Sequence, residues 1–345
     1  MSRHVNIPIF IPHLGCPNTC VFCNQRTISG RMSFDISETK KEIESALSTV
    51  EQDARVEIAF FGGSFTGIDR TLMIDLLRLA HSYLRSGRVS SVRCSTRPDY
   101  ISREILDILE EYGVRTIELG LQSADEAVLS ACRRGHGFEA EERACRMITE
   151  RGFELVGQMM IGLPGSDIDS EMRTADFIIR AGASAARVYP TVVFRDTELC
   201  RMYERGEYES PTLEDAVSRT AAVVRRLREG GVKVIRVGLC SSENLASDRT
   251  YVAGPNHPAI GELCENKIYY DRITEAASAL AFNDRSILRI AVSRGELSKA
   301  VGQRKRNKLL LKDSLGVRGV EFEELDALAV GEISVRVEEG EKKCI

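Results

Sequence analysis

The most constraining feature of this sequence is an alternation of short apolar runs with longer amphipathic runs, which continues to about residue 238. A short apolar run between turn residues indicates a buried strand, and apolar residues spaced three and four apart indicate a helix. We predict strands at 5–11, 56–62, 92–96, 116–121, 154–161, 184–193 and 232–238. We predict helices at about 37–50, 70–85, 102–112, 125–151 with a break near 135–137, 167–181 and 212–229.

Six strand–helix repeats predict an α/β fold in which a parallel sheet is built by right-handed crossovers. The predicted strands are nearly all apolar, as expected when both faces of a sheet are covered. A closed eight-fold barrel would need two more repeats, so the count favours a partial, open (β/α)6 TIM-like barrel. In such folds the ligand site lies at the carboxyl ends of the strands.

The chain has 345 residues, enough for one large domain and a smaller one. The alternation fades after Gly238, so we expect a core barrel over 1–240 and a small C-terminal α+β accessory domain over 241–345. Residues 241–273 have no simple period and read as a loop-rich cover for the open side of the barrel. Beyond them, 286–297 reads as a strand and a turn, 302–316 as the start of a helix, and 333–345 as an edge strand that frays toward its end.

The sequence gives no sign of membrane insertion or export. It has no run of about 18 or more apolar residues, which a transmembrane helix requires. The N-terminal apolar run contains two prolines and no small-residue cleavage site, so it fits a buried strand better than a signal peptide. We expect a cytoplasmic protein without a membrane partner.

Polar or glycine-rich residues lie at or just after the end of each of the first six predicted strands. In strand order they are Cys16, Cys20 and Cys23, then Gly62–Phe65, Ser95–Asp99, Gly120–Ser123, Gln158–Gly165 and Tyr189–Thr191. Because the carboxyl ends of parallel strands meet at one edge, this pattern predicts a single large site there.

Cys16, Cys20 and Cys23 are the only clustered cysteines among the ten in the chain. A disulfide set needs an even number of thiols and an oxidising compartment, so it does not fit. A zinc site remains open, because His13 could supply the fourth ligand. An iron–sulfur cluster with three thiolates also remains open, and it would leave one iron without a protein ligand. The seven scattered cysteines are expected to be buried, reduced thiols.

The C-x3-C-x2-C spacing after the first strand, with Phe22 before the last cysteine and Gly62-Gly63 one strand later, resembles the radical S-adenosylmethionine superfamily. The resemblance implies a partial barrel of the radical SAM type and an enzyme with a [4Fe–4S] cluster on the three cysteines. The open iron would hold S-adenosylmethionine, and reduction would release a 5′-deoxyadenosyl radical that abstracts hydrogen from a substrate. It also implies an electron donor such as flavodoxin or ferredoxin.

Further motifs resemble the radical domain of the elongator catalytic subunit, which modifies wobble uridines in tRNA. They are FFGGSFT, CSTRPDYI, IELGLQS with RRGH, MIGLPGSD, and RVYPTVVFRDTEL with RGEY, and the similarity covers about 7–238. GLQS and GLPG also resemble the oxygen-independent coproporphyrinogen oxidases. From the length of the chain we expect no elongator-type acetyltransferase domain, and its cluster cysteines are more closely spaced than those of the elongator subunit.

The resemblance also implies which residues contact S-adenosylmethionine. They are Gly62, Gly63, Ser64, Ser95, Thr96, Gln122, Ser123, Arg134, Gln158 and Gly162. Structural alternatives stay open, since the two glycines fit a tight turn and Ser123 fits a helix cap.

Three further residues near these motifs have open roles. Arg97 fits an ion pair as well as a ligand contact, whereas His136, at a helix break, is expected at the surface or in a cap. Tyr189 is the candidate catalytic residue, because a tyrosine facing the substrate could relay a hydrogen atom; packing is its alternative.

Residues 285–318 contain ten basic and two acidic side chains, a charge of +8 within a chain of net charge −4. Such asymmetry indicates a local anionic partner, and the elongator resemblance suggests tRNA. The candidate RNA-binding residues are Arg304, Lys305, Arg306 and Lys308. The alternative is an ordinary solvated surface.

Three functions are therefore carried forward. The first is a radical SAM enzyme that modifies RNA, most directly a tRNA base. The second is a radical SAM enzyme acting on a small metabolite such as a tetrapyrrole. The third is a non-catalytic, zinc-stabilised RNA-binding protein.

Overall fold

The computed structural model describes residues 4–11, 16, 20–23, 35–51, 53–239 and 250–339. The chain forms two compact units, one from residues 1–216 and 226–256 and the other from 217–225 and 257–345. In the described ranges, no helix is both long enough and apolar enough to cross a membrane.

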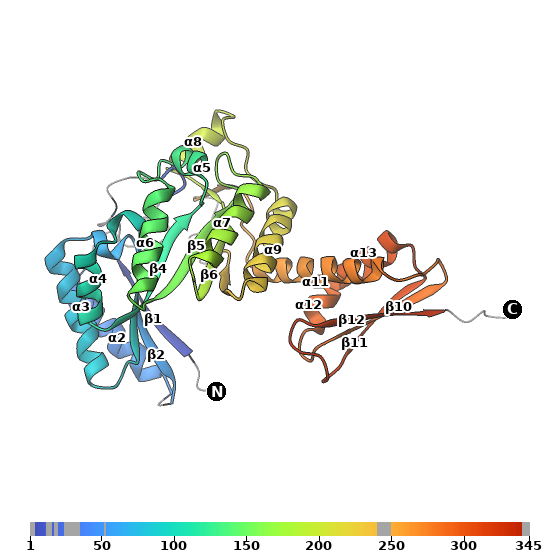
Figure 1. Ribbon diagram of the computed structural model, residues 1–345, viewed down its shortest axis with the longest axis horizontal. Coiled ribbons are helices and arrows are strands. Elements are labelled where there is room, and N and C mark those ends of the chain that lie inside the picture. The colour runs from blue at the N-terminus through green and yellow to red at the C-terminus, as the bar shows by residue number, and fades with distance from the viewer. Residues whose placement is uncertain are drawn as a thin grey trace. The chain divides into compact units, whose positions relative to one another are not determined.

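The first unit is built on a seven-stranded sheet in which every neighbouring pair is parallel (Figure 1). The strand order is β1-β2-β3-β4-β5-β6-β8, which leaves β1 and β8 at the two ends of the sheet. The strands are β1 His4–Ile11, β2 Arg55–Gly62, β3 Ser91–Thr96, β4 Val114–Gln122, β5 Glu154–Ile161, β6 Ala185–Pro190 and β8 Lys233–Val237. The predicted open, parallel barrel is therefore confirmed, because the strands follow chain order and β1 and β8 do not pair with each other in the described residues.

Helices connect the strands and lie along the outside of the sheet (Figure 1). They are α2 Ile36–Thr49, α3 Arg70–Arg85, α4 Arg103–Glu111, α5 Glu126–Ala131, α6 Phe138–Glu150, α7 Ile168–Arg180, α8 Glu198–Glu204 and α9 Leu213–Glu229. The predicted break in the long helical run is confirmed, since α5 and α6 are separated by a turn in which Gly135 has φ +76°. Apolar residues of alternate strand positions, such as Ile9, Phe60 and Leu119, are fully or almost fully buried.

The predicted strand at 184–193 is wrong in its second half. β6 ends at Pro190, and Val193–Phe194 form a separate strand, β7, which pairs antiparallel with β9 (Tyr251–Ala253). A proline cannot donate a backbone hydrogen bond to a sheet, which makes Pro190 a natural end for the strand.

The other face of the sheet is polar, contrary to the expectation of almost wholly apolar strands. Arg93 on β3 lies 3.0 Å from the Glu57 carboxylate on β2 and 2.9 Å from the Glu118 carboxylate on β4. Glu118 also lies 2.8 Å from Arg187 on β6. Burial raises the pKa of Glu57, but a hydrogen bond from Ser91 and the charge of Arg93 outweigh it and leave that pKa below its ordinary value. Pairing of opposite charges makes the burial of these groups tolerable.

The same network shows that the sheet curls. The Arg187 guanidinium lies 5.3 Å from the centre of the Phe61 ring, although β6 and β2 are separated in the sheet by three strands. Neighbouring strands are about 4.8 Å apart, so a flat sheet would hold these residues much farther from each other. The polar face is therefore the concave, inner face of a partial barrel.

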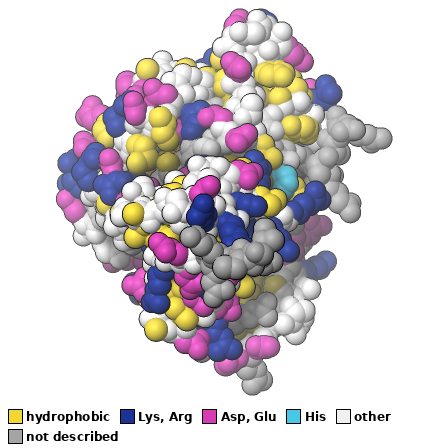
Figure 2. Space-filling model, turned by 90° about the vertical axis from the view of Figure 1, so that its right-hand side faces the viewer, with side chains coloured by type: hydrophobic (Ala, Val, Ile, Leu, Met, Phe, Trp, Pro, Cys, Tyr) yellow, Lys and Arg dark blue, Asp and Glu magenta, His cyan; other side chains and the backbone are white. Residues whose placement is uncertain are grey.

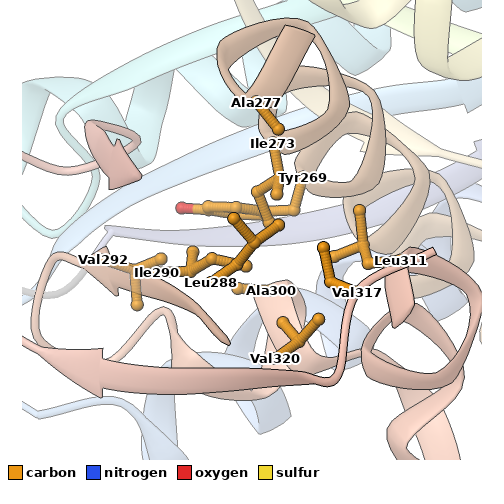
Figure 3. Packing of buried hydrophobic residues seen from close by; sticks show 10 residues of the cluster. All are labelled: Tyr269, Ile273, Ala277, Leu288, Ile290, Val292, Ala300, Leu311, Val317 and Val320. Atoms are coloured by element: carbon orange, nitrogen blue, oxygen red, sulfur yellow. The ribbon is translucent and has the colours of Figure 1, made fainter. Parts of the chain in front are cut away.

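Over its described residues from 257 to 339, the second unit contains a three-stranded sheet and three α-helices, and residues 217–225 of α9 also belong to it. β10 (Ser286–Val292) lies between β11 (Gly319–Glu324), which is parallel to it, and β12 (Ile333–Glu339), which is antiparallel. The helices are α11 Ile260–Ser278, α12 Leu297–Val301 and α13 Arg306–Leu315. Figure 3 shows side chains of α11 and β10, with others from α12, α13 and β11, directed toward one shared core.

The expectation of a loop-rich segment over 241–273 is wrong from Ile260 onward, where α11 begins. The buried residues of this helix include Ile260, Cys264, Asn266 and Tyr269, which do not form one narrow apolar stripe. A helix buried on several sides lacks the amphipathic period by which a surface helix is recognised.

Candidate functional site

The site begins where β1 and β2 end side by side. Ile11 and Gly62 are partners in the sheet, and the Ile11 carbonyl oxygen accepts a hydrogen bond of 3.1 Å from the Gly63 amide. A Cβ on Gly62 would lie 2.3 Å from that same oxygen, and the φ of Gly62 is +105°. Glycine is thus required at residue 62 by the close approach of β1, which agrees with the tight-turn alternative.

Ser64 and Cys16 meet just beyond this turn. Ser64 is buried, and its hydroxyl oxygen lies 3.3 Å from the Cys16 sulfur. Thr96, at the end of β3, shares a buried hydrogen bond of 2.6 Å with the Thr66 hydroxyl. Ser95 is half-buried on the inner face, in register with Glu118. These predicted residues therefore lie at the carboxyl ends of the first three strands, as expected.

Cys20 is contacted by two buried arginines. Arg134 Nη1 donates to the Cys20 sulfur at 3.1 Å, and Arg97 Nη1 does so at 3.7 Å. Arg134 also donates to the Gly120 carbonyl at the end of β4, while its Nε has no hydrogen-bond partner in the described part of the chain. A buried, unsatisfied guanidinium N–H favours an acceptor such as a ligand carboxylate at this position.

Arg97 is held by a cluster of charged groups that sequence reasoning did not assemble. It donates to both carboxylate oxygens of Asp99, at 2.9 and 3.0 Å, and to the Arg134 carbonyl oxygen. Burial raises the pKa of Asp99, but hydrogen bonds from His136 and Arg97 hold it well below its ordinary range. The ion-pair role of Arg97 is therefore confirmed, and its contact with a ligand stays a prediction.

His136 is not at the surface, so that expectation is wrong. Its ring is 3% exposed and lies 3.3 Å from both Asp99 and Glu141. Burial alone would lower the pKa of His136, yet its hydrogen bonds to the two carboxyl groups raise it. Burial raises the pKa of Glu141 to about 7. The RRGH motif was the only local signal, because the partners of His136 come from distant parts of the sequence.

Gln122 and Gln158 come together on neighbouring strands β4 and β5. Gln158 Nε2 donates to Gln122 Oε1 at 3.4 Å, and Gln122 has a φ of +72° at an irregularity in the strand pairing. Ser123 does not cap the following helix. Asp125 is the N-cap of α5, and the Ser123 hydroxyl accepts a hydrogen bond from the Asp125 amide instead.

Gly162 and Tyr189 have their own local partners. The Gly162 amide donates to Glu171 at 2.7 Å, its carbonyl accepts from Tyr208 at 2.6 Å, and a Cβ on it would lie 2.6 Å from Pro211. Tyr189 is half-buried near the end of β6, where burial raises its pKa and Arg187 opposes that effect. The candidate RNA-binding residues Arg304, Lys305, Arg306 and Lys308 belong to the second unit.

The three clustered thiols fit an iron–sulfur cluster by their chemistry. Cys20 and Cys23 share one turn, in which the Cys23 amide donates to the Cys20 carbonyl at 3.0 Å. Arg97 donates to the Cys20 sulfur, and Cys16 also lies close enough to raise the pKa of the same guanidinium. Thiolates beside buried cations suit an anionic cluster.

As placed, however, no three His, Cys, Asp or Glu side chains of the described ranges form a group that could hold a metal ion. The assignment of the three cysteines as metal ligands therefore stays a prediction. His13, the fourth ligand of the zinc alternative, lies outside the described residues.

The scattered cysteines behave as expected where the structure describes them. Cys94, Cys132, Cys145, Cys200 and Cys264 are all buried, and burial raises the pKa of each. Four of these values are about 12, so those thiols stay protonated and unreactive near neutral pH. Cys240 and Cys344 lie outside the described residues.

Comparison with known proteins identifies relatives across most of the chain. The chain is 30% identical over 216 residues to an uncharacterized protein of Methanocaldococcus jannaschii, which covers 59% of this chain and 66% of that protein. It is 27% identical over 217 residues to the tRNA uridine(34) acetyltransferase of Methanocaldococcus infernus, covering 55% of this chain and 40% of that protein. The chain thus spans less than two thirds of the length of these relatives.

A solved structure and two family models agree with these matches. The archaeal Methanocaldococcus infernus Elp3 with an N-terminal deletion has the same fold, with a TM-score of 0.63 and 20% identity over 80% of this chain and 63% of that one. A radical SAM superfamily model matches residues 10–178, and a Radical_SAM C-terminal domain model matches residues 183–270. The chain therefore belongs to the radical SAM superfamily of enzymes.

Proposed function

We propose that this chain is a radical SAM enzyme that modifies RNA, with a tRNA base as its substrate. Cys16, Cys20 and Cys23 would hold a [4Fe–4S] cluster, reduced by a donor such as flavodoxin or ferredoxin. With S-adenosylmethionine bound, that cluster supplies the radical that abstracts hydrogen from the substrate. The observation that carries the proposal is the contact of Cys20 with Arg134 and Arg97 at the carboxyl edge of the sheet.

The residues around Cys20 have complementary tasks. Arg134 would bind a carboxylate through its unsatisfied Nε and, with Arg97, orient Cys20. Asp99 and the Arg134 carbonyl fix Arg97, so the guanidinium is already ordered before any ligand arrives. Gln122 and Gln158 offer amide donors and acceptors for ribose hydroxyls. Gly62, Gly63 and Ser64 form the turn at the end of β2.

Two observations support an RNA substrate. One is the name of a relative, the tRNA uridine(34) acetyltransferase, and the other is the surface of the second unit. Arg304, Lys305 and Arg306 are exposed, and so are Leu309 (58%) and Leu310 (42%) on α13. Neither Arg304 nor Lys305 has an ion-pair partner in the described part of the second unit. Cationic side chains that no carboxylate neutralises remain available for phosphates.

The proposed RNA-binding surface consists of the cations of residues 304–308, and cations elsewhere in the second unit differ from them. On the face drawn in Figure 2, Lys and Arg side chains occur at several points among Asp and Glu side chains. Arg289 illustrates a cation that is already neutralised, since it lies 3.2 Å from Glu321 and 2.6 Å from Glu338. The proposal therefore predicts that particular cations of residues 304–308, and not positive charge in general, support RNA binding.

Metal analysis after anaerobic purification tests the cluster. We expect about four irons per chain and release of 5′-deoxyadenosine after reduction. Alanine at Cys16, Cys20 or Cys23 is expected to abolish both, whereas Cys264→Ala, a buried cysteine of the second unit, is expected to preserve them. Bound zinc in place of iron would contradict the enzyme proposal and favour the zinc-stabilised alternative.

Salt-dependent binding to total tRNA tests the substrate. The triple variant Arg304→Gln, Lys305→Gln, Lys308→Gln should bind more weakly and lower the slope of log K against log salt by about 2 to 3. Arg289→Gln, which removes a neutralised cation, should leave the slope unchanged. Equal slopes for the triple variant and the wild type would argue against this RNA surface and favour a small-metabolite substrate.

A further inference from the structure

The inner face of the sheet carries an aromatic surface next to the candidate cluster loop. Phe10 and Phe61 are partners on β1 and β2, one residue before Ile11 and Gly62, where those strands end. Their ring centres are 6.3 Å apart, with an angle of 44° between the planes. Phe10 is 39% exposed and Phe61 is half-buried.

The two faces of β1 and β2 differ sharply at this point. Ile9, Ile11 and Phe60 point to the helix-covered side and are at most 1% exposed. Phe10 points to the other side and is 39% exposed, so its ring remains accessible on the inner face near the carboxyl end of β1. A flat aromatic ring that stays accessible beside a predicted ligand site is suited to stacking.

Arg187 completes this surface. Its guanidinium lies 5.3 Å from the centre of the Phe61 ring, and Glu118 fixes it with contacts of 2.8 and 3.0 Å. A guanidinium plane can itself stack on a heterocycle, and here it is ordered before a ligand binds. The Arg187 side chain is 15% exposed, so part of it still faces solvent.

The charge of the inner face suits an anionic ligand. Along the ion network two carboxylates, Glu57 and Glu118, alternate with two guanidiniums, Arg93 and Arg187, and balance them. Arg236 on β8 is the partner of Arg187 in the sheet, and the described residues give it no ion pair. Its side chain therefore adds a positive charge that the network does not neutralise.

We propose that Phe10, Phe61 and Arg187 form a stacking site for a nucleobase, with Arg236 placed for a phosphate of the same nucleotide. This inference rests on the proposed RNA function and identifies where the substrate base enters the first unit. A base extruded from an RNA loop presents both a flat ring and an adjacent phosphate, which matches the aromatic and cationic halves of this surface.

The chain contains no tryptophan, which gives a direct reporter. In the variant Phe10→Trp the new indole is the only tryptophan, and a base stacked on it should quench its fluorescence. The probes are a synthetic anticodon stem–loop RNA and the same RNA with abasic loop positions, which keeps the phosphates. We expect quenching with the first RNA and none with the second.

Affinity measurements complete the test. Phe10→Ala and Phe61→Ala should each weaken binding of the stem–loop about 5- to 150-fold, the range of one lost base stack. Tyr203→Ala, which removes an aromatic residue of similar exposure (39%) on α8, should have no effect. The abasic RNA should bind the wild type and Phe10→Ala equally.

The outcomes separate this inference from the proposed function. If the stem–loop binds through Arg304, Lys305 and Lys308 but neither quenches the indole nor responds to Phe10→Ala, the stacking site is wrong and the RNA function stands. If the wild type binds neither RNA, both proposals are wrong.

Discussion

Glu141 allows a quantitative test of how this fold treats a buried charge. Its side chain is fully buried, one carboxyl oxygen lies 3.3 Å from His136 Nε2, and the other has no hydrogen-bond partner among the described residues. Burial raises the pKa of Glu141 from 4.5 to about 7, although His136 acts in the opposite direction. We predict that the stability of the first unit falls as the pH rises from 4.5 to 7.

The sign follows from proton binding. Between these pH values the native state keeps the proton on Glu141 and the unfolded chain releases it, so the free energy of unfolding decreases with pH. The interval between 4.5 and about 7, at 1.36 kcal/mol per pKa unit, corresponds to about 3 kcal/mol. His136 adds to this loss only at the upper end of the range, because its native-state pKa is raised above 6.5 and the stability from its protonated form is lost as the pH rises from about 6.5 through that raised pKa.

The measurement is urea unfolding of the reduced, metal-free protein at several pH values from 4.5 to 7. Hydrogen exchange in peptides from α6 restricts the readout to the unit that contains Glu141. Glu141→Gln should flatten the dependence by about 3 kcal/mol across the range. Glu142→Gln, an exposed neighbour on the same helix, should follow the wild type. Parallel curves for Glu141→Gln and the wild type would refute the reasoning.

Two packing predictions use the same unfolding measurement. Gly62→Ala should destabilise the first unit by about 3 kcal/mol or more, because the new Cβ would clash with the Ile11 carbonyl oxygen and residue 62 has a positive φ. Gly87 also has a positive φ, +73°, but it lies in open space, so Gly87→Ala should cost only about 1 kcal/mol. A similar loss for both variants would contradict the close approach. Leu288→Ala, fully buried on β10, should cost about 2 to 5 kcal/mol, and Leu309→Ala, 58% exposed on α13, less than about 0.5 kcal/mol. A mild effect at Leu288 would argue against the core of Figure 3.

The sheet could be predicted because its signals are local. Each strand of the seven-stranded sheet except β6 begins and ends within two residues of the predicted range, since apolar runs and helix breaks lie close together in the sequence. The carboxyl ends of parallel strands meet at one edge of the sheet. This explains why Ser64 lies beside Cys16 and Gln122 lies beside Gln158.

The ion pairs could not be predicted, because their partners are far apart in the sequence. Arg93 reads as one polar residue in an apolar strand, yet it contacts a carboxylate 36 residues earlier and another 25 residues later. His136 was misread for the same reason, since Asp99 precedes it by 37 residues and nothing local marks the pair. Such contacts arise only once the strands are in register.

The open ends of the seven-stranded sheet have a consequence for self-association. A terminal strand exposes backbone amides and carbonyls that can recruit a strand from another molecule and start aggregation. Pro8 lies in the middle of β1, at one end of the sheet, and proline is tolerated there only where its nitrogen faces away from β2. One amide on that margin is thereby removed, which makes continuous pairing with a foreign strand unfavourable.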